Sequence, residues 1–254
     1  MTEAPTVLLE IADGIATVTL NRPDQRNALN LAMCDDLLRV MTQINRDDAV
    51  RVVVFKANGS VFGAGADLKE RVGQTAEWVR ERRRRAFAAY EALAACAKPC
   101  LAAVHGAAVG SSAEIASACD FVILSTAASF RYPEVARGTV GATQRLPRIV
   151  GKALAKELLF TGRIVEADEA VRIGLANRAV PPDQLDAVVG ELARAIAAAP
   201  PLAIRLVKRC IDQGVETDLA SGLQIERQAI EQALAGAEWQ QGVAAFVAGA
   251  TDKS

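Results

Sequence analysis

The chain of 254 residues is poor in the residue types on which several kinds of site depend. It contains one histidine, His105, and its five cysteines are scattered, with only Cys96 and Cys100 close together. A structural zinc site needs four cysteine or histidine ligands at suitable spacing, so the sequence offers none. The cysteines lie mostly in apolar surroundings, which predicts reduced core thiols in a cytoplasmic protein. His105 is interpreted as a structural residue.

An excess of either charge is also lacking, because 29 basic and 30 acidic residues give a formal net charge of −1. Nucleic acids and anionic membrane surfaces are bound by basic patches, so neither is an expected partner. No apolar run reaches the length of about 20 residues that spans a membrane. The polar start over residues 1–5 is unlike a secretory signal. With 51% hydrophobic residues, a large core can form without disulfides or metal.

Two common catalytic patterns are missing as well. Gly110, Ser111 and Ser112 lack the G-x-S-x-G spacing of a serine nucleophile. The glycine-rich stretch over residues 58–68 lacks the lysine and hydroxyl residue of a P-loop. Its three glycines predict instead a loop whose backbone N–H groups stay open to a ligand.

Two glutamates, Glu114 and Glu134, lie in the most informative stretch of the chain. The apolar run over residues 100–104 predicts a buried strand. Small residues follow it, and Ser111 or Ser112 is predicted to cap a short helix that carries Glu114 in its first turn. Such a helix start offers free N–H groups and a positive dipole end to a ligand.

Each glutamate taken alone has a plain structural explanation. Glu114 could simply complement the helix dipole. Glu134, which follows a proline at the end of a predicted strand, could simply be solvated. As a pair in an apolar, small-residue setting, however, they form a candidate acid–base site.

Hydrophobic patterns predict an α/β fold with alternating strands and helices. A helix predicted over residues 75–97 carries five arginines, interpreted as a solvated face from which one or two could reach a ligand phosphate. The alanine-rich end is apolar on more than one face, which predicts packing on another subunit. Predicted strands cover residues 7–11, 15–20, 51–57, 100–104, 121–124, 129–132 and 174–180, and predicted helices cover 30–45, 75–97, 143–149, 152–160, 167–173 and most of the chain from 183.

Seven blocks in order carry a family resemblance: L-N-R-P-D-Q-R-N-A-L (20–29), F-G-A-G-A-D-L-K-E (62–70), K-P-C-L-A-A-V-H-G-A-A-V-G-S-S-A-E (98–114), A-C-D (118–120), Y-P-E (132–134), T-Q-R-L-P-R-I-V-G (143–151) and A-F-V (245–247). In these the chain resembles the enoyl-CoA hydratase/isomerase (crotonase) family. The resemblance implies an α/β crotonase-like spiral of repeated ββα units. Residues 1–195 would form the core with the CoA and active sites, and residues 196–254 a helical region that builds trimers, commonly paired into hexamers.

An acyl-coenzyme A thioester is the ligand that the resemblance implies, without a metal or redox cofactor. The backbone N–H groups of Ala66 and Ser111 would form an oxyanion hole for the thioester oxygen, where enolate charge develops. The residues that match the family's CoA-binding segments are Arg26, Ala28, Ala64, Ala66, Asp67, Leu68 and Gly110.

Glu114 and Glu134 match the two glutamates of the family's hydratases. By resemblance, Glu114 positions and deprotonates water and Glu134 donates a proton. Both together favour an enoyl-CoA hydratase, a reversible hydro-lyase of fatty acid or related acyl-CoA degradation. An isomerase or hydrolase of the same family is the first alternative. A non-catalytic CoA-binding scaffold, or an RNA-binding relative, is the alternative of another class.

Three departures from the family pattern affect these expectations. Gly110-Ser111-Ser112 replaces a usual run of three glycines, which matters if Ser111 requires a positive φ. The loop after Glu134 is about three residues shorter than the usual glycine-rich form, which bears on water placement. The basic, aromatic tail that helps cover CoA is largely absent, with Lys253 as its remnant. The length of the acyl group is left open by the sequence.

Overall fold

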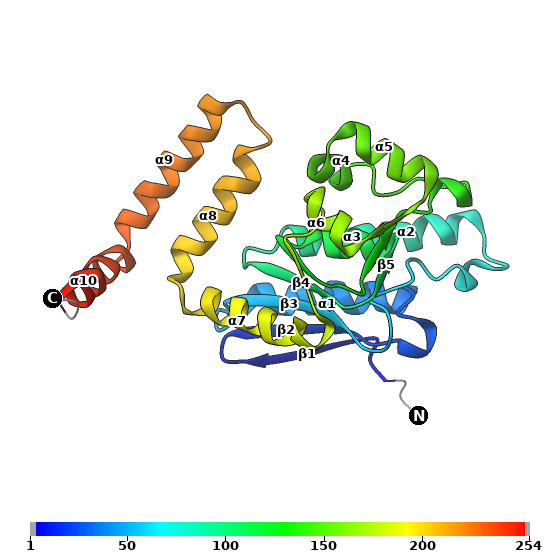
Figure 1. Cartoon of the computed structure of the whole chain (residues 1–254), viewed down its shortest axis with the longest axis horizontal. Helices are drawn as coiled ribbons and strands as arrows, with labels where there is room; N and C mark the ends of the chain where they lie inside the picture. Colours follow the sequence, from blue (N-terminus) through cyan, green and yellow to red (C-terminus); the bar gives the residue numbers. More distant parts are fainter. Residues whose placement is uncertain (1–3, 252–254) are drawn as a thin grey trace.

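A six-stranded sheet forms the centre of the chain in a computed structural model that describes residues 4–251 (Figure 1). Residues 1–3 and Lys253, which entered the sequence predictions, lie outside the described part. The strand order is β1-β2-β3-β4-β6-β9, with β1 and β2 antiparallel and every other neighbouring pair parallel. The strands are β1 (Val7–Ala12), β2 (Ile15–Leu20), β3 (Val52–Ala57), β4 (Cys100–Val104), β6 (Phe121–Ser125) and β9 (Arg178–Val180).

A second, smaller sheet has the order β5-β7-β8. Its strands are β5 (Ala107–Val109), β7 (Ser129–Arg131) and β8 (Ile164–Glu166). The helices are α1 (Leu31–Arg46), α2 (Ala76–Ala94), α3 (Ser111–Ala118), α4 (Arg145–Val150), α5 (Lys152–Thr161), α6 (Ala167–Arg172), α7 (Leu185–Ala198), α8 (Pro201–Gly214), α9 (Leu219–Ala235) and α10 (Glu238–Thr251). Short 3-10 turns add η1 (Pro23–Gln25), η2 (Lys69–Arg71), η3 (Val135–Arg137) and η4 (Pro182–Gln184).

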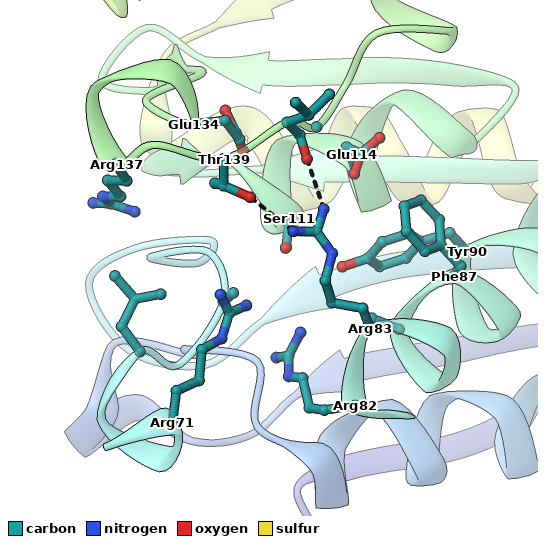
Figure 2. Close-up of a pocket in the computed structure, with 15 residues that line it drawn as sticks. Arg71, Arg82, Arg83, Phe87, Tyr90, Ser111, Glu114, Glu134, Arg137 and Thr139 are labelled. Atoms are coloured by element: carbon teal, nitrogen blue, oxygen red, sulfur yellow. Dashed lines mark hydrogen bonds between the residues drawn. The ribbon is translucent and has the colours of Figure 1, made fainter. Parts of the chain in front are cut away.

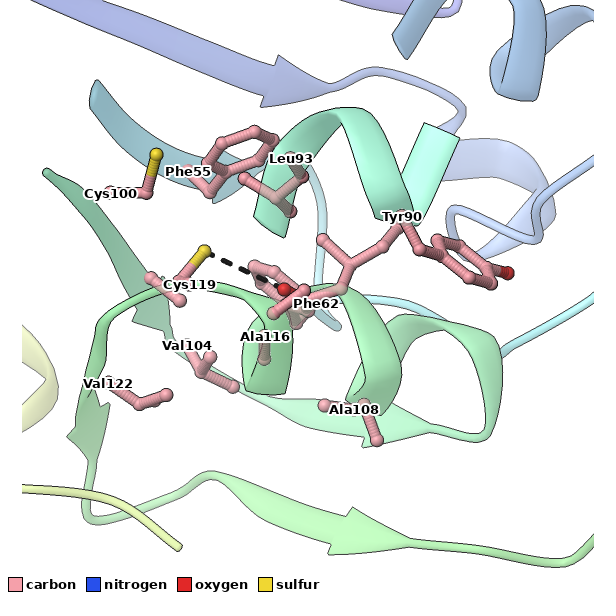
Figure 3. Packing of buried hydrophobic residues seen from close by; sticks show 14 of the residues in the cluster. Phe55, Phe62, Tyr90, Leu93, Cys100, Val104, Ala108, Ala116, Cys119 and Val122 are labelled. Atoms are coloured by element: carbon pink, nitrogen blue, oxygen red, sulfur yellow. Dashed lines mark hydrogen bonds between the residues drawn. The ribbon is translucent and has the colours of Figure 1, made fainter. Parts of the chain in front are cut away.

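The central strands of the main sheet are buried on both faces, which explains why β3 reads as an unbroken apolar run. Alternate residues of a strand point to opposite faces. Val53 and Phe55 therefore join the main core with α1, α2 and α3, while Val52 and Val54 pack against α7 on the other face. Figure 3 shows part of the main core, in which Phe62 packs among residues of α2, α3 and β4.

The loops that follow β3 and β4 lie side by side because these strands are parallel neighbours. The Gly63 N–H donates to the Ala107 carbonyl at 3.0 Å, and the Val109 N–H donates to the Gly63 carbonyl at 2.9 Å. This pairing joins the glycine-rich loop over residues 58–68 to β5, directly before α3. It brings two segments with open amides together.

Most predicted elements are confirmed to within a few residues. Between the two predicted strands over residues 7–11 and 15–20, Asp13 and Gly14 have φ values of 52° and 77°, the left-handed conformation that a tight hairpin needs. Asn30 caps α1 by accepting a hydrogen bond from the Met33 N–H at 3.0 Å. Two strands of three residues each, β5 and β8, were not predicted.

Three helices at the C-terminal end, α8, α9 and α10, extend away from the sheet on one side of the molecule (Figure 1). α8 and α9 pack on each other. Within residues 4–251 no single helix is long and apolar enough to cross a membrane, and only the pair Pro182–Ala198 and Pro201–Gly214, bent by 108°, passes that test jointly.

Candidate active site

A cavity of about 150 Å³ opens where the loop after β3, the start of α3 and the loop after Glu134 meet, with α2 along one side (Figure 2). Both predicted catalytic carboxyls, Glu114 and Glu134, line it, and so do both predicted oxyanion residues, Ala66 and Ser111. Segments far apart in the sequence therefore place all four residues at one site. The volume is several times the roughly 30 Å³ that one water molecule occupies in the liquid.

Two open amides face this cavity. Among the described residues, the N–H groups of Ala66 and Ser111 donate no hydrogen bond to another protein group. Ser111 is the first residue of α3, so its N–H is one of those that a helix leaves free. The positive φ of this turn falls on Gly110, at 50°, and not on Ser111. A serine at position 111 is therefore compatible with the backbone.

Ser112 does not have the role that the sequence suggested. The prediction that Ser111 or Ser112 caps α3 is wrong, because Gly110 is the N-cap and no side chain bonds there. The fully buried Ser112 hydroxyl instead accepts a hydrogen bond from the Gly65 N–H at 3.2 Å. A Cβ at Gly63 would collide with this hydroxyl. Ser112 thus ties the start of α3 to the loop that carries Ala66.

Glu114 lies in the first turn of α3 and is half-buried. Burial raises the pKa of this carboxyl above its ordinary value. The charge of Arg145 opposes the rise, and the neighbouring Glu134 adds to it. The charge of Glu134 therefore disfavours the ionisation of Glu114.

Glu134 comes directly before η3 and is held between two glycines. A Cβ at Gly110 would lie 2.7 Å from Glu134 Oε1, and one at Gly141 would lie 3.0 Å from its Cγ. Its Oε2 is buried and has no hydrogen-bond partner within the described part of the chain. Burial raises the pKa of Glu134, against weaker opposition from Arg137 and Arg83. This environment favours the protonated form.

Two arginines of α2 contradict the interpretation of this helix as a solvated basic face. Arg82 is 2% exposed, and its Nε donates to Glu70 Oε1 at 2.6 Å. Arg83 reaches across the cavity to donate to Thr139 Oγ1 at 2.7 Å and to the Val140 carbonyl at 2.6 Å (Figure 2). The helical repeat turns these two inward, whereas the remaining three arginines, at 80, 84 and 85, are exposed as expected.

A second hollow, of about 220 Å³, is bordered by Val61, Gly63 and Ala64 of the glycine-rich loop. It is lined by Arg26 and Ala64, two of the predicted CoA-binding residues, together with Arg131 and Arg137. Arg137 also lines the first cavity. Three guanidinium groups at one hollow form a suitable surface for phosphate groups.

The other predicted CoA-binding residues are divided between the cavity and the loops behind it. Leu68 lines the cavity with Ala66. Asp67 pairs with Arg22 at 3.1 Å, and Arg22 also donates to the Ala28 carbonyl. These contacts hold Asp67 and Ala28 in the loop scaffold.

Sequence reasoning missed the polar residues that connect these loops. The Asn27 side chain is fully buried, and its amide donates to the carbonyls of Asn58 at 2.7 Å and Val61 at 3.0 Å. Its φ of 51° is unusual for a residue other than glycine, although asparagine tolerates it. The turn-rich block over residues 21–27 was the available signal, but its partners are distant in sequence.

Comparisons with known proteins find relatives of this chain in both sequence and structure. The sequence profile of the enoyl-CoA hydratase/isomerase family matches residues 10–251. A crotonyl-CoA hydratase of Syntrophomonas wolfei is 36% identical, over 95% of this chain and 94% of that protein. A short-chain-enoyl-CoA hydratase of Clostridium acetobutylicum is 36% identical, over 96% and 95%. The crystal structure of an enoyl-CoA hydratase from Bacillus anthracis superimposes with a TM-score of 0.92 at 37% identity, covering 95% of each chain.

The chain belongs to the enoyl-CoA hydratase/isomerase family. The predicted family and the predicted α/β crotonase-like fold are therefore confirmed.

Proposed function

We propose that the protein is an enoyl-CoA hydratase, which reversibly adds water to the 2,3-double bond of a trans-2-enoyl-CoA to give a 3-hydroxyacyl-CoA. One observation carries the proposal: two half-buried carboxyls, Glu114 and Glu134, face the same cavity as the open amides of Ala66 and Ser111. Hydration needs a base, an acid and an oxyanion site, and this cavity offers all three.

In the proposed mechanism the thioester oxygen accepts hydrogen bonds from the N–H groups of Ala66 and Ser111. These donors stabilise the enolate that forms when water attacks C3, and one such donor is typically worth about 3–4 kcal/mol of barrier. Ionised Glu114 takes a proton from the water while the water oxygen bonds to C3. Protonated Glu134 gives a proton to C2, and the enolate collapses to the saturated thioester.

The different surroundings of the two carboxyls support this division of roles. Burial raises the pKa of both carboxyls, and arginines oppose the rise at both, Arg145 at Glu114 and Arg137 with Arg83 at Glu134. Glu134 has a buried oxygen without a partner in the described chain, which disfavours its charged form. A protonated acid and an ionised base can therefore coexist in one cavity.

The nucleotide end of the thioester is proposed to occupy the second hollow. Arg26, Arg131 and Arg137 would contact its phosphate groups there, and the chain of the ligand would pass Ala64 to reach Ala66. No metal or redox cofactor enters this proposal, since the four groups supply the base, the acid and both oxyanion donors.

The proposal includes a homotrimer or homohexamer in the cytoplasm, assembled through the helical region over residues 196–254. Large apolar side chains on α8, on α9 and in the turn between them support it because they are half exposed or more in the single chain, including Val207, Ile211, Val215 and Leu219. Apolar surface of this extent is typical of a contact between subunits.

Product analysis tests the proposed reaction. Short, medium and branched trans-2-enoyl-CoA thioesters are incubated with the protein, and loss of the conjugated enoyl absorbance is followed together with the products. A hydratase forms 3-hydroxyacyl-CoA, an isomerase shifts the double bond without adding a hydroxyl, and a hydrolase releases free CoA. Binding without turnover, unchanged in Glu114→Gln, would favour a non-catalytic scaffold instead.

A further inference from the structure

The wall of the cavity along α2 and η2 is unusually cationic for a site that holds an acyl chain. Pockets for apolar ligands are lined mainly by hydrophobic and aromatic side chains. Here Phe87 and Tyr90 are joined by Arg71, Arg82 and Arg83, whose guanidinium groups lie near one another below the carboxyls (Figure 2).

Two of these arginines are occupied by the protein itself. Arg82 is paired with Glu70 and donates to the Leu29 carbonyl. Both terminal nitrogens of Arg83 donate hydrogen bonds, one to Thr139 Oγ1 and the other to the Val140 carbonyl. Both side chains therefore have structural partners.

Arg71 has none. Its Nε is buried without a hydrogen-bond partner, and its guanidinium makes no ion pair within residues 4–251. Burial lowers the pKa of Arg71, and the charges of Arg82 and Arg83 lower it further. Arg71 is half-buried, and a partly desolvated cation with like charges beside it is stabilised when an anion joins it.

Among residues 4–251, no carboxylate forms an ion pair with Arg71. Glu70 is the acidic group that acts most on Arg71, but it is bonded to Arg82 at 2.6 Å and to the Leu31 N–H at 2.8 Å. The charges that act most on the catalytic Glu114 and Glu134 come from other arginines. The missing counter-charge is thus expected from the ligand.

We propose that the acyl group of the substrate carries a carboxylate that binds Arg71, with Arg83 beside it. The substrate class is then a CoA monothioester of a short unsaturated dicarboxylic acid, and Arg71 is the residue that sets this specificity. The inference rests on the hydratase function proposed above. A planar guanidinium can accept such a carboxylate with two parallel hydrogen bonds.

A CoA phosphate is the less suitable anion for Arg71. The second hollow already offers Arg26, Arg131 and Arg137 to the phosphate groups. Arg71 lines the cavity that contains Glu114 and Glu134, where the reacting acyl carbons must lie.

The test compares two thioesters of matched shape. Glutaconyl-CoA has a carboxylate at C5, and trans-5-methyl-2-hexenoyl-CoA has two methyl groups there instead. Hydration kcat/KM is measured for both with the wild type, Arg71→Met, Arg71→Lys and the exposed control Arg84→Met. We expect the wild type to favour the charged thioester, and Arg71→Met to lose about 10- to 100-fold on it alone, as for a hydrogen bond to a charged group. Arg71→Lys should recover part of this loss, and Arg84→Met should match the wild type.

Turnover of the neutral thioester reports on the fold and on the hydratase proposal independently. If the wild type hydrates neither thioester, the hydratase proposal fails. If it hydrates the neutral one as well as or better than the charged one, the inference about the acyl group is overturned while hydration stands. An equal loss on both thioesters in Arg71→Met would also overturn it, because Arg71 would then serve the CoA moiety or the fold.

Discussion

At the scale of single residues, small side chains and backbone groups determine the site as much as the two glutamates do. Ser112 joins the two amide-bearing loops, and Gly110 leaves room for the Glu134 carboxyl. The position of an oxyanion donor matters because the donor acts on charge that develops only during the reaction. Substitutions of one hydroxyl or one methyl group should therefore affect the chemistry.

Ser112→Ala removes the acceptor of the Gly65 N–H and leaves this buried donor unpaired. We expect the free energy of unfolding to fall by about 1–3 kcal/mol. Because Gly65 precedes Ala66, kcat should fall more than KM rises. Denaturant unfolding and hydration kinetics measure the two effects. Ser129→Ala, at a hydroxyl with no hydrogen bond in the described chain, is the control, and an equal effect there would contradict the explanation.

Gly110→Ala places a methyl group 2.7 Å from Glu134 Oε1 and imposes a side chain on a φ of 50°. Strain of this kind costs about 1–3 kcal/mol. The Glu134 carboxyl must also move, so kcat should decrease by about 100-fold or more, the usual contribution of a general acid. Gly138→Ala, at a glycine with φ of 64° but open space around it, separates backbone strain from the collision.

Glu134→Gln should stabilise the fold in a pH-dependent way. The pKa of Glu134 is raised in the folded protein, so the native state binds its proton more tightly than the unfolded chain. The cost of an ionised buried carboxylate is present above the folded pKa and vanishes below the unfolded value of about 4.3. The variant should melt at a higher temperature than the wild type at pH 8, and the gap should close toward pH 4. A gap independent of pH, or the same gap in Glu10→Gln, would contradict this cause.

At the scale of secondary-structure elements, the site depends on where separate strands and helices meet. α2 supplies one wall, and Arg83 fastens it to the loop after Glu134. That loop directly follows Glu134, so its fixed position influences how much room remains for water and for the acyl group.

Arg83→Met breaks both hydrogen bonds to the loop. We expect kcat/KM to fall by about 10-fold or more, since hydrogen bonds to a charged group are typically worth about 1.5–3 kcal/mol. Hydration kinetics of Arg83→Met and Arg84→Met measure the effect. An equal loss in both variants would show that the loop contact is not the cause.

Strong hydrophobic patterns and local turn signals made much of the fold predictable. The hairpin at Asp13-Gly14 and the boundaries of β4 follow from such signals alone. β5 could not be recognised, because three small residues become a strand only through distant pairing with β7. The buried position of the Arg82 side chain depends on its ion pair with Glu70, and no local sequence pattern predicts that pair.

The main residues of the candidate site were predictable from the sequence, but the contacts that support them were not. The motif resemblance predicted four site residues, and all of them line one cavity: Glu114, Glu134, Ala66 and Ser111. The role of Ser112 and the unpaired Arg71 were not predictable, because both depend on contacts across the fold.

At the scale of the whole molecule, α8, α9 and α10 extend from the core and leave apolar side chains uncovered in the single chain. Leu219 and Phe246 are both 78% exposed. We expect light scattering to give a mass of three or six times the 26.8 kDa chain. Leu219→Glu should shift this mass toward the monomer if Leu219 lies in the contact. A monomeric wild type would contradict the proposed assembly.

The most direct test of the central claim is the hydration rate of the best thioester substrate with the wild type, Glu114→Gln and Glu134→Gln. If two carboxyls share the reaction, each variant should lose about 100- to 10,000-fold in kcat while still binding the thioester. A wild type that forms 3-hydroxyacyl-CoA while either variant retains its rate would contradict the two-carboxylate mechanism. A wild type that binds the thioester without hydrating it would contradict the function itself.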